Sequence, residues 1–387
     1  FFFVYCYTVM EKIFLIPGPT EPHKDTLKYY SEYYGSSDVD TEGFSKDYDE
    51  VCSLLAEMLN IPENSSTVVM SGEGMLSLWG ALNSGMKPGD KVLSINSGLY
   101  GKGIGEMAKG RGGNVEFFST EEGTVFTIEE HWNSFETKAR EFLPNMITLV
   151  HCETPTGTLV DSTVLERIGA LANELDCLFY VDMVSSTGGT PIDLSKNQID
   201  LALIGSQKCL SLHSDLSIVI VSEKAWRLMS ERNSSYSGYD SLLPWKNVVK
   251  NLNDGKERLF PYTMNWSSIK ALSHSLSLFK EEGFEKVYER HSQCAEYTRE
   301  HVQKMGLELL TDAKICSPTV TAIKVPFHIE WKELNLKLQE QGIFFGRNYG
   351  PLENKVFRIG HMGTQANMDN VKKSINILEN ILAEMSK

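Results

Sequence analysis

Two stretches of the sequence decide the fold: LFYVD at Leu178–Asp182 and LALIGSQK at Leu201–Lys208. Each begins as a short apolar run of the kind that forms a buried strand, and each ends in polar residues. Lys208 follows Asp182 by 26 positions, which is enough for one strand–helix–strand unit. Because such a unit brings both strand ends to the same edge of a sheet, we expect Asp182 and Lys208 to lie close together.

Three further apolar runs also lead directly into polar or glycine-rich residues. They are Thr67–Met70 before Ser71–Gly74, Val92–Ile95 before Ser97–Gly101, and Ile147–Val150 before His151–Gly157. Short apolar runs that alternate with longer amphipathic stretches predict an α/β fold with a mostly parallel sheet. Ligands of such sheets bind beyond the carboxyl ends of the strands, so five segments converge on one predicted site. The alternative for each loop alone is that Gly, Ser and Asp only serve its turns and helix caps.

The pattern changes after about residue 260 and predicts two domains. Residues 10–259 form the expected large domain, and residues 260–387 form a smaller α+β domain that the N-terminal segment also contacts. Residues 1–9 are apolar and aromatic, and we expect an extension outside the fold; a short anchoring segment is the alternative. The expected elements of the smaller domain are helices at Trp266–Glu282, Glu285–Gly306, Trp331–Gln341 and from Met368, and strands at Thr319–Val325 and Val356–Ile359.

Composition limits the classes of partner. The chain has 387 residues, of which 41% are hydrophobic and 23% charged, and this composition is typical of a globular protein. A formal net charge of −14 argues against nucleic acid or an anionic membrane as a partner and favours small molecules. The seven cysteines form no CxxC pair and no cluster at metal spacing, so we expect reduced thiols, a cytoplasmic location and no metal. No run approaches the roughly 20 apolar residues of a membrane helix.

A lysine and an aspartate at neighbouring strand ends suit pyridoxal chemistry. The lysine forms an imine and moves a proton, while an acid partner keeps the pyridine nitrogen protonated so that the ring acts as an electron sink. Lys208 and Asp182 fit these two places. The spacing alone also allows a solvated surface lysine and an aspartate that only caps a helix.

The motifs around both residues resemble those of class V aminotransferases. VDMVSSTGG at Val181–Gly189 and GSQKCL at Gly205–Leu210 are similar to the cofactor signature of that family. PGPT at Pro17–Thr20 and FRIG at Phe357–Gly360 also match, so the resemblance covers nearly the whole chain. It implies fold type I, with a large, mostly parallel sheet of the seven-stranded type, a smaller C-terminal α+β domain, and a site at the interface of a homodimer or homotetramer.

The resemblance also implies individual roles in binding the cofactor ring. Lys208 is the expected Schiff-base lysine, and Asp182 is the expected partner of the ring nitrogen. Val184 is expected on one ring face and Tyr100 on the other, and Thr154 is expected to contact the ring oxygen.

The loop Ser71-Gly72-Glu73-Gly74 stands where most members of the family bind the phosphate of pyridoxal 5′-phosphate at a helix N-terminus. Glu73 occupies the position of a small hydroxyl residue. Two unit charges about 4 Å apart repel by roughly 4 kcal/mol at an effective dielectric constant near 20, so a carboxylate conflicts with a phosphate. A neutral hydroxymethyl group, as in pyridoxamine, would instead donate a hydrogen bond to Glu73. The alternative is a first-turn acid that points to solvent.

Further segments resemble those of the pyridoxamine–pyruvate aminotransferases: Gly72-Glu73, Ser97–Gly103 and Arg358–Gly363. This resemblance implies the reaction pyridoxamine + pyruvate to pyridoxal + L-alanine, with pyridoxal held as an aldimine on Lys208. It also implies that Arg347 and Arg358 bind the keto-acid carboxylate, which a planar guanidinium pairs with in two-pronged fashion.

Three alternatives stay open. In an alanine–glyoxylate or serine–pyruvate aminotransferase that depends on pyridoxal 5′-phosphate, Ser71, Gly74 and the partner subunit's Tyr262 and Thr263 would hold the phosphate. A non-catalytic binding protein would not need the lysine, aspartate and arginine that the chain retains. A carbon–sulfur lyase would need a mobile cysteine near the substrate, and Cys209 is expected to point away.

Overall fold

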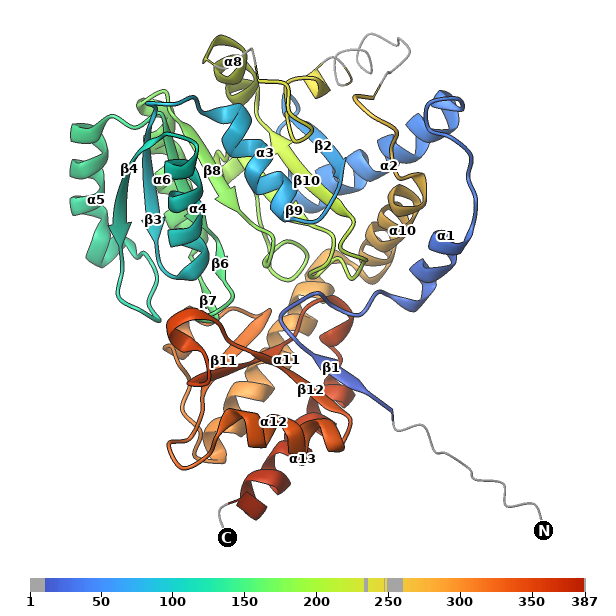
Figure 1. Cartoon of the computed structure of the whole chain (residues 1–387), viewed down its shortest axis with the longest axis vertical. Helices are drawn as coiled ribbons and strands as arrows, with labels where there is room; N and C mark the ends of the chain where they lie inside the picture. Colours follow the sequence, from blue (N-terminus) through green and yellow to red (C-terminus); the bar gives the residue numbers. More distant parts are fainter. Residues whose placement is uncertain (1–10, 233–235, 247, 249–259, 386–387) are drawn as a thin grey trace.

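The computed structural model describes residues 11–232, 236–246, 248 and 260–385, so the expected extension at residues 1–9 lies outside the described residues. Figure 1 shows a large α/β unit above a smaller unit built mainly from the C-terminal part of the chain. Both units contain a sheet covered by helices, which confirms the predicted fold class.

The large unit is built on a seven-stranded sheet. Its strands, in spatial order, are β2 (Ser66–Ser71), β10 (Leu216–Val221), β9 (Leu201–Gly205), β8 (Leu178–Asp182), β5 (Met146–Val150), β3 (Lys91–Asn96) and β4 (Asn114–Ser119). Only β10 runs antiparallel to its neighbours in this sheet; the other strands share one direction. The five strands that the sequence singled out therefore end at one edge, as predicted. A separate hairpin, β6 (Cys152–Glu153) with β7 (Thr158–Leu159), follows β5.

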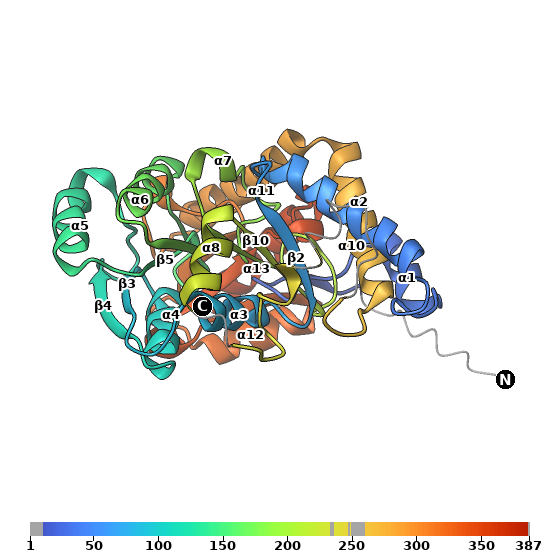
Figure 2. The same cartoon turned by 90° about the horizontal axis from the view of Figure 1, so that it is seen from above.

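Helices cover both faces of this sheet, which explains why β5, β8 and β9 are apolar and buried along their whole length. Figure 2 shows α6 and α7 on one side of the sheet and α3 and α4 on the other. The helices of this part of the chain are α1 (Leu27–Ser31), α2 (Thr41–Leu59), α3 (Met75–Gly85), α4 (Leu99–Gly110), α5 (Ile128–Phe142), α6 (Ser162–Glu174), α7 (Leu194–Asn197) and α8 (Glu223–Arg232).

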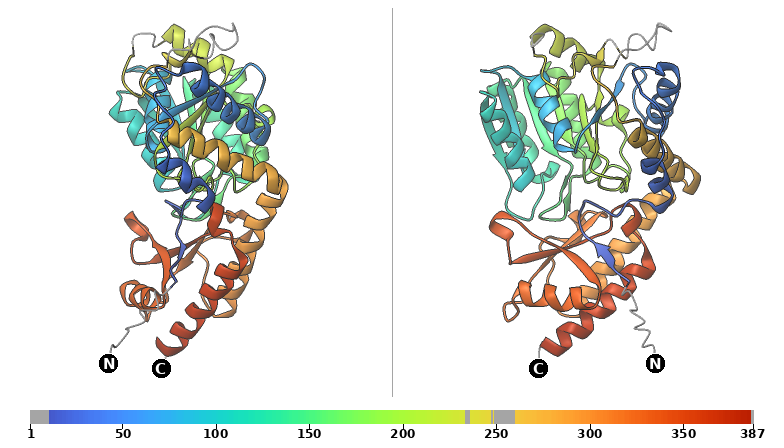
Figure 3. Two further views of the ribbon diagram at one scale, coloured as in Figure 1. Left: turned by 90° about the vertical axis from the view of Figure 1, so that its right-hand side faces the viewer. Right: turned by 45° about the vertical axis from the view of Figure 1, so that its right-hand side comes forward.

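The smaller unit has a four-stranded sheet in the order β1 (Ile13–Leu15), β12 (Ile343–Arg347), β13 (Val356–Gly360) and β11 (Val320–Lys324). Its helices are α11 (Phe284–Lys304), α12 (Trp331–Glu340) and α13 (Met368–Met385). Helices α11, α12 and α13 and strands β11 and β13 lie within a few residues of the predicted elements, whereas β1 and β12 were not predicted. Strand β1 pairs in parallel with β12, so the first described strand belongs to a sheet otherwise made by the C-terminal region (Figure 3).

Helix α10 (Trp266–Glu282) forms where the sequence predicts it but packs differently. The expected boundary at residue 260 places this helix in the smaller domain. Its apolar residues Trp266, Ile269 and Leu272 instead share a core with the seven-stranded sheet. The reason is that α10 lies against α2, so its apolar face completes the core of the large unit.

The chain crosses between the two units at Ile16–Thr20, directly after β1. The Ile16 N–H donates to the Gln365 side chain at 2.6 Å, and Thr20 N–H donates to the Gln207 carbonyl at 2.9 Å. A Cβ atom on Gly360 would lie 2.2 Å from the Ile16 carbonyl oxygen, so only glycine in β13 lets the segment pass this close.

Within the described ranges, no helix is both long and apolar enough to cross a membrane. The same part of the chain contains no group of three or more His, Cys, Asp or Glu side chains arranged to hold a metal ion.

The crossing predicts a steric cost for Gly360→Ala. The added methyl group must push Ile16 away from β13, and we expect a loss of about 1–3 kcal/mol in the free energy of unfolding, measured by urea denaturation. Gly103→Ala in α4 is the matched control, because a Cβ there meets nothing within 4 Å. It should be neutral or stabilising by up to about 1 kcal/mol. Equal unfolding midpoints for the two variants would contradict the described crossing.

Candidate active site

A cavity of about 230 Å³ opens at the carboxyl ends of β2, β8 and β9. It is lined by Gly18, Pro19, Glu73, Gly74, Met75, Leu78, Tyr100, Cys152, Asp182, Val184, Ser185, Gln207, Lys208 and Ser214. Of the predicted site residues, Glu73, Gly74, Tyr100, Asp182, Val184 and Lys208 thus meet at one place. The other predicted residues do not line this cavity: Ser71, Gly72, Thr154, Tyr262, Thr263, Arg347 and Arg358.

Lys208 follows β9 and directs its amine toward the crossing segment. Its Nζ donates a hydrogen bond of 2.6 Å to the Pro17 carbonyl, and its own carbonyl accepts one of 2.8 Å from the Thr20 hydroxyl. Burial and, as a smaller effect, the nearby charge of Arg358 together lower the pKa of Lys208 to about 8. A large fraction of the amine is therefore neutral near pH 8, as a nucleophilic lysine requires.

Asp182 is the last residue of β8 and is only 7% exposed. Its Oδ1 accepts a 2.9 Å hydrogen bond from the Val184 N–H, which also fixes the turn that carries Val184 into the cavity wall. Burial raises the pKa of Asp182 to about 6, and the negative charge of Glu73 acts in the same direction. A cationic partner in the cavity would favour the charged form of this carboxylate.

Tyr100 lies in the first turn of α4, and its backbone is held by a residue that the sequence analysis missed. Glu153 Oε1 accepts from the Tyr100 N–H at 2.9 Å, and Glu153 Oε2 accepts from the Gly101 N–H at 3.0 Å. Burial raises the pKa of Glu153 to about 7, while these two hydrogen bonds oppose the shift. The sequence did offer a signal for Glu153, because it is an acidic residue inside His151–Gly157, one of the loops predicted to follow a strand and reach the site. The Thr154 side chain lies close enough to the phenol of Tyr100 to lower its pKa, although burial raises that pKa overall.

Glu73 is exposed in the single chain, yet both oxygens of its carboxylate have protein partners. Oε2 accepts from the Met75 N–H at 2.8 Å, at the start of α3, and Oε1 accepts from the Gln207 side-chain amide. The side chain therefore does not simply point to solvent. Gln207 is a second residue that the sequence analysis quoted in a motif without assigning it to the site.

Arg358 is 3% exposed and lies close enough to Lys208 and Tyr100 to shift the pKa of each. Its Nε donates to the Arg347 carbonyl at 3.1 Å. The Arg347 side chain is exposed. Both guanidinium groups lie over the ring of Tyr349, at 5.1 Å for Arg358 and 5.6 Å for Arg347. The two predicted carboxylate-binding arginines thus lie together, on either strand of the β12–β13 pair.

Tyr262, Thr263 and Ser71 form a neighbouring group outside the cavity of their own chain. The Tyr262 ring stacks on Tyr239 with centroids 4.4 Å apart, and the Tyr239 hydroxyl donates to the Ser71 carbonyl at 3.2 Å. The Thr263 hydroxyl donates to the Asp38 carboxylate.

The two cysteines next to the cavity are protonated thiols. Burial raises the pKa of Cys209 to about 12 and that of Cys152 to about 11. Cys152 lines the cavity, whereas Cys209 faces the Ser185 carbonyl, as expected for a side chain that points away. Neither sulfur is a nucleophile at neutral pH, because the thiolate is the reactive form.

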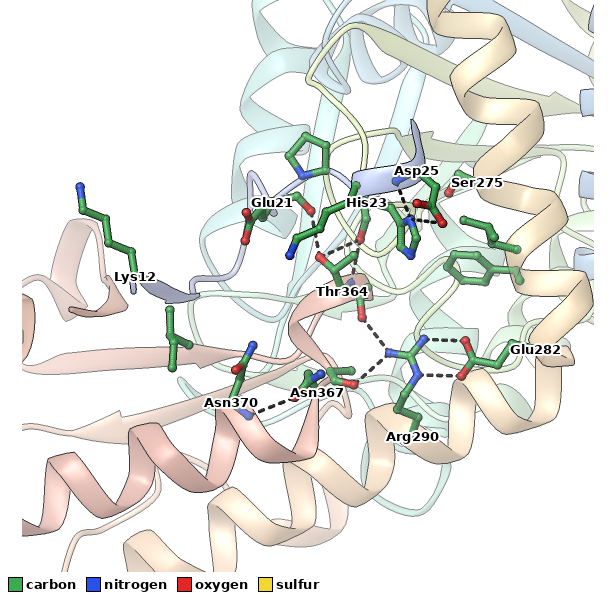
Figure 4. A pocket seen from close by; sticks show the side chains of 18 of the residues that line it. Lys12, Glu21, His23, Asp25, Ser275, Glu282, Arg290, Thr364, Asn367 and Asn370 are labelled. Atoms are coloured by element: carbon green, nitrogen blue, oxygen red, sulfur yellow. Dashed lines mark hydrogen bonds and ion pairs between the residues drawn. The ribbon is translucent and has the colours of Figure 1, made fainter. Parts of the chain in front are cut away.

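A second cavity of about 690 Å³ is lined by Ser211, in the turn that follows Lys208 (the lysine turn), by the N-terminal segment and by helices α10, α11 and α13 (Figure 4). Arg290 pairs with Glu282 at 2.7 Å and donates to the Gly363 carbonyl at 2.8 Å. The guanidinium of Arg290 therefore links α10, α11 and the segment before α13. The Ser211 hydroxyl accepts from the Thr364 N–H at 2.9 Å, which ties the lysine turn to the same segment.

The residues of the first cavity fit a pyridoxal-type ring. They combine an amine with a lowered pKa, a carboxylate at a buried strand end, and Tyr100 and Val184 in the wall, where they are able to cover the two ring faces. This set of groups is what pyridoxal chemistry takes from a protein.

Comparison with known proteins agrees with this geometry. The family model "Aminotransferase class-V" matches residues 18–347. Alanine–glyoxylate aminotransferase of Oryctolagus cuniculus is 31% identical over 82% of this chain and 80% of its own length. Pyridoxamine–pyruvate transaminase of Mesorhizobium japonicum is also 31% identical, over 83% of this chain and 81% of its own length. The crystal structure of ureidoglycine–glyoxylate aminotransferase from Bacillus subtilis superposes with a TM-score of 0.88 at 28% identity, covering 97% and 94% of the two chains. The protein is therefore an aminotransferase and belongs to the class V family.

Proposed function

We propose that this aminotransferase transfers the amino group of pyridoxamine to pyruvate and forms pyridoxal and L-alanine. The observation that carries the proposal is the position of the Glu73 carboxylate, at the edge of the cavity and at the start of α3. A relative at 31% identity, the transaminase of Mesorhizobium japonicum, carries this activity in its name.

The N-terminus of α3 is the place in this cavity best suited to an anion, because the first N–H groups of a helix have no partners within it. Glu73 already accepts from one of them, the Met75 N–H, and also takes the amide of Gln207. A phosphate dianion there would compete for the same donors and be repelled by roughly 4 kcal/mol or more. A neutral hydroxymethyl group brings a donor of its own, which a carboxylate accepts.

The residues around the ring then have distinct tasks. When bound, a pyridoxal-type ring supplies an electron sink for the carbon that loses its proton. Asp182 keeps the ring nitrogen protonated, Tyr100 and Val184 cover the two faces, and Thr154 contacts the ring oxygen. Nζ of Lys208 takes the proton from the amine-bearing carbon of pyridoxamine and delivers a proton to the carbonyl carbon of pyruvate.

Arg358 and Arg347 bind the carboxylate of pyruvate or alanine. Arg358 is buried beside the lysine, so its guanidinium is poorly hydrated and pairs strongly with a carboxylate. Arg347 is exposed, and its guanidinium and that of Arg358 lie over the same ring, that of Tyr349.

The second candidate is an alanine–glyoxylate or serine–pyruvate aminotransferase that depends on pyridoxal 5′-phosphate. The relative from Oryctolagus cuniculus, at the same 31% identity, favours it. In that case Ser71 and Gly74 would hold the phosphate together with the partner subunit's Tyr262 and Thr263 in a homodimer, and Glu73 would turn outward.

The two candidates differ in their response to Glu73→Ser. The wild-type protein should be purified without bound phosphate cofactor and should prefer pyridoxamine to pyridoxamine 5′-phosphate. The variant removes the charge from the helix N-terminus and should reverse the preference by two or more orders of magnitude, as several kcal/mol require. The measurement is the ratio of kcat/KM for the two amines, with phosphate analysis of each protein.

Glu129→Ser is the matched control, because Glu129 is an exposed first-turn acid of α5. It should leave the preference unchanged. Wild-type protein that keeps stoichiometric pyridoxal 5′-phosphate through dialysis would decide for the second candidate.

The lowered pKa of Lys208 predicts a pH profile for the capture of free pyridoxal. Only the neutral amine attacks the aldehyde, so the rate should rise with pH and level off above about 8, well below the 10.5 of an ordinary lysine. Stopped-flow absorbance of the bound ring measures this rate.

Lys208→Ala should capture no pyridoxal and lose at least about three orders of magnitude in turnover. Turnover above a trace level in that variant would rule out Lys208.

Removal of the buried guanidinium in Arg358→Ala should act on the keto acid. One charged contact is worth roughly 1.5–3 kcal/mol, so the KM for pyruvate should increase by one to two orders of magnitude while that for pyridoxamine changes little. Arg358→Lys keeps the charge without the planar fork and should fall between the two. An unchanged KM for pyruvate would place the carboxylate site elsewhere.

A further inference from the structure

We propose that Glu153 is a positioning residue that holds Tyr100 against the face of the bound ring. The inference rests on the proposed contact between Tyr100 and the ring. It does not depend on whether the ring carries a phosphate, because the Tyr100 contact is to the part that both forms share.

The carboxylate of Glu153 reaches the start of α4 from a different part of the fold. Glu153 lies in β6, and its two oxygens accept from two consecutive backbone N–H groups, those of Tyr100 at 2.9 Å and Gly101 at 3.0 Å. Two oxygens in one plane match two adjacent N–H groups of a first helical turn, and the positive end of the helix dipole favours the negative charge.

The start of α4 is shaped to admit this carboxylate. The N-cap residue is Gly98, which has no side chain to cap the helix itself. A Cβ atom on Gly98 would lie 2.5 Å from Cγ of Glu153, so the glycine leaves the space that the glutamate fills. The usual local cap, a serine or aspartate at this position, is thus replaced by a residue 55 positions later in the chain.

Glu153 is also an expensive group to bury. It is 2% exposed, and it makes no ion pair with a lysine, arginine or histidine in the described part of the chain. Burial raises its pKa to about 7, so the surroundings disfavour its charged form. A buried carboxylate without a cationic partner is retained when it serves a site rather than the stability of the core.

The hairpin that carries Glu153 is closed by hydrogen bonds to the Glu153 carbonyl. The Glu153 carbonyl accepts from the Gly157 N–H at 2.9 Å and from the Thr156 hydroxyl at 3.1 Å. The side chain of the next residue, Thr154, lies close enough to the phenol of Tyr100 to lower its pKa, against the larger effect of burial, which raises it. Two consecutive residues of the β6–β7 hairpin thus lie at the backbone and beside the phenol of Tyr100, and the carboxylate of Glu153 fixes the backbone from which the ring projects.

Glu153→Gln tests the inference, because an amide keeps one acceptor and turns its NH₂ donor against the second backbone N–H. Pyridoxine and pyridoxine 5′-phosphate serve as ring ligands, and the one that the wild-type protein binds is used. We expect its dissociation constant to increase by about tenfold in the variant. The circular dichroism of captured pyridoxal in the visible range should also change, because it reports the tilt of the ring. Glu153→Asp keeps the charge but reaches only one N–H, and it should give a smaller effect with the same sign.

The double variant with Tyr100→Ala separates positioning from general destabilisation. If Glu153 acts through Tyr100, Glu153→Gln should change ligand affinity by less than twofold in the Tyr100→Ala background. Asp161→Asn is the matched control, since Asp161 caps α6 through the Thr163 N–H at 2.8 Å and lines no part of the cavity. It should lower the melting temperature without altering affinity or the dichroism.

Two outcomes would overturn the inference. One is an unchanged affinity and dichroism in both Glu153 variants, with only a lower melting temperature. The other is a loss of affinity that persists in the Tyr100→Ala background. If Glu153→Gln does not fold, Glu153→Asp decides the question with the same two measurements. Wild-type protein that binds only pyridoxine 5′-phosphate would refute the proposed substrate and still allow this test.

Discussion

The site depends on a lysine amine that is largely removed from water at the junction of two sheets. Nζ of Lys208 has the Pro17 carbonyl as a partner, and Pro17 stands in the segment that crosses between the sheets. That segment passes so close to β13 that Gly360 has no room for a side chain. The crossing therefore buries the lysine, and burial lowers its pKa to about 8. Arg358, a residue of the small sheet, also lowers this pKa, so both units contribute to the lowered pKa of the Lys208 amine.

Three carboxylates of the site lie near one another, since Glu73 acts on the pKa of Asp182 and Asp182 on that of Glu153. Each accepts from backbone N–H groups directly after a strand. Asp182 accepts from Val184, Glu73 from Met75 and Glu153 from Tyr100 and Gly101. These N–H groups are free because turns and first helical turns leave donors without partners inside the element. The arrangement lets several negative charges lie close together with few cations between them. Burial raises the pKa of both Asp182 and Glu153, and these backbone hydrogen bonds oppose the shift.

Much of this was predictable from local sequence pattern. The five apolar runs that end in polar residues are strands that end at one edge of the large sheet, and α10 begins and ends at the predicted residues. The pairing of β1 with β12 was not predictable in the same way, because a three-residue strand carries almost no periodic signal. The packing of α10 in the core of the large unit was not predictable either, because the apolar face of a helix does not indicate which of two cores it packs against.

The sequence by itself determined the family, the fold class and the lysine–aspartate pair, because those follow from contiguous motifs and from the direction of parallel strands. Only the tertiary structure decided the contacts of Glu73 and Glu153. Gln207 meets Glu73 from across the cavity, and Glu153 caps a helix that begins more than fifty residues earlier. Partners so distant along the chain leave no local pattern. A buried carboxylate is recognised as part of a site only when the fold shows which N–H groups it accepts from.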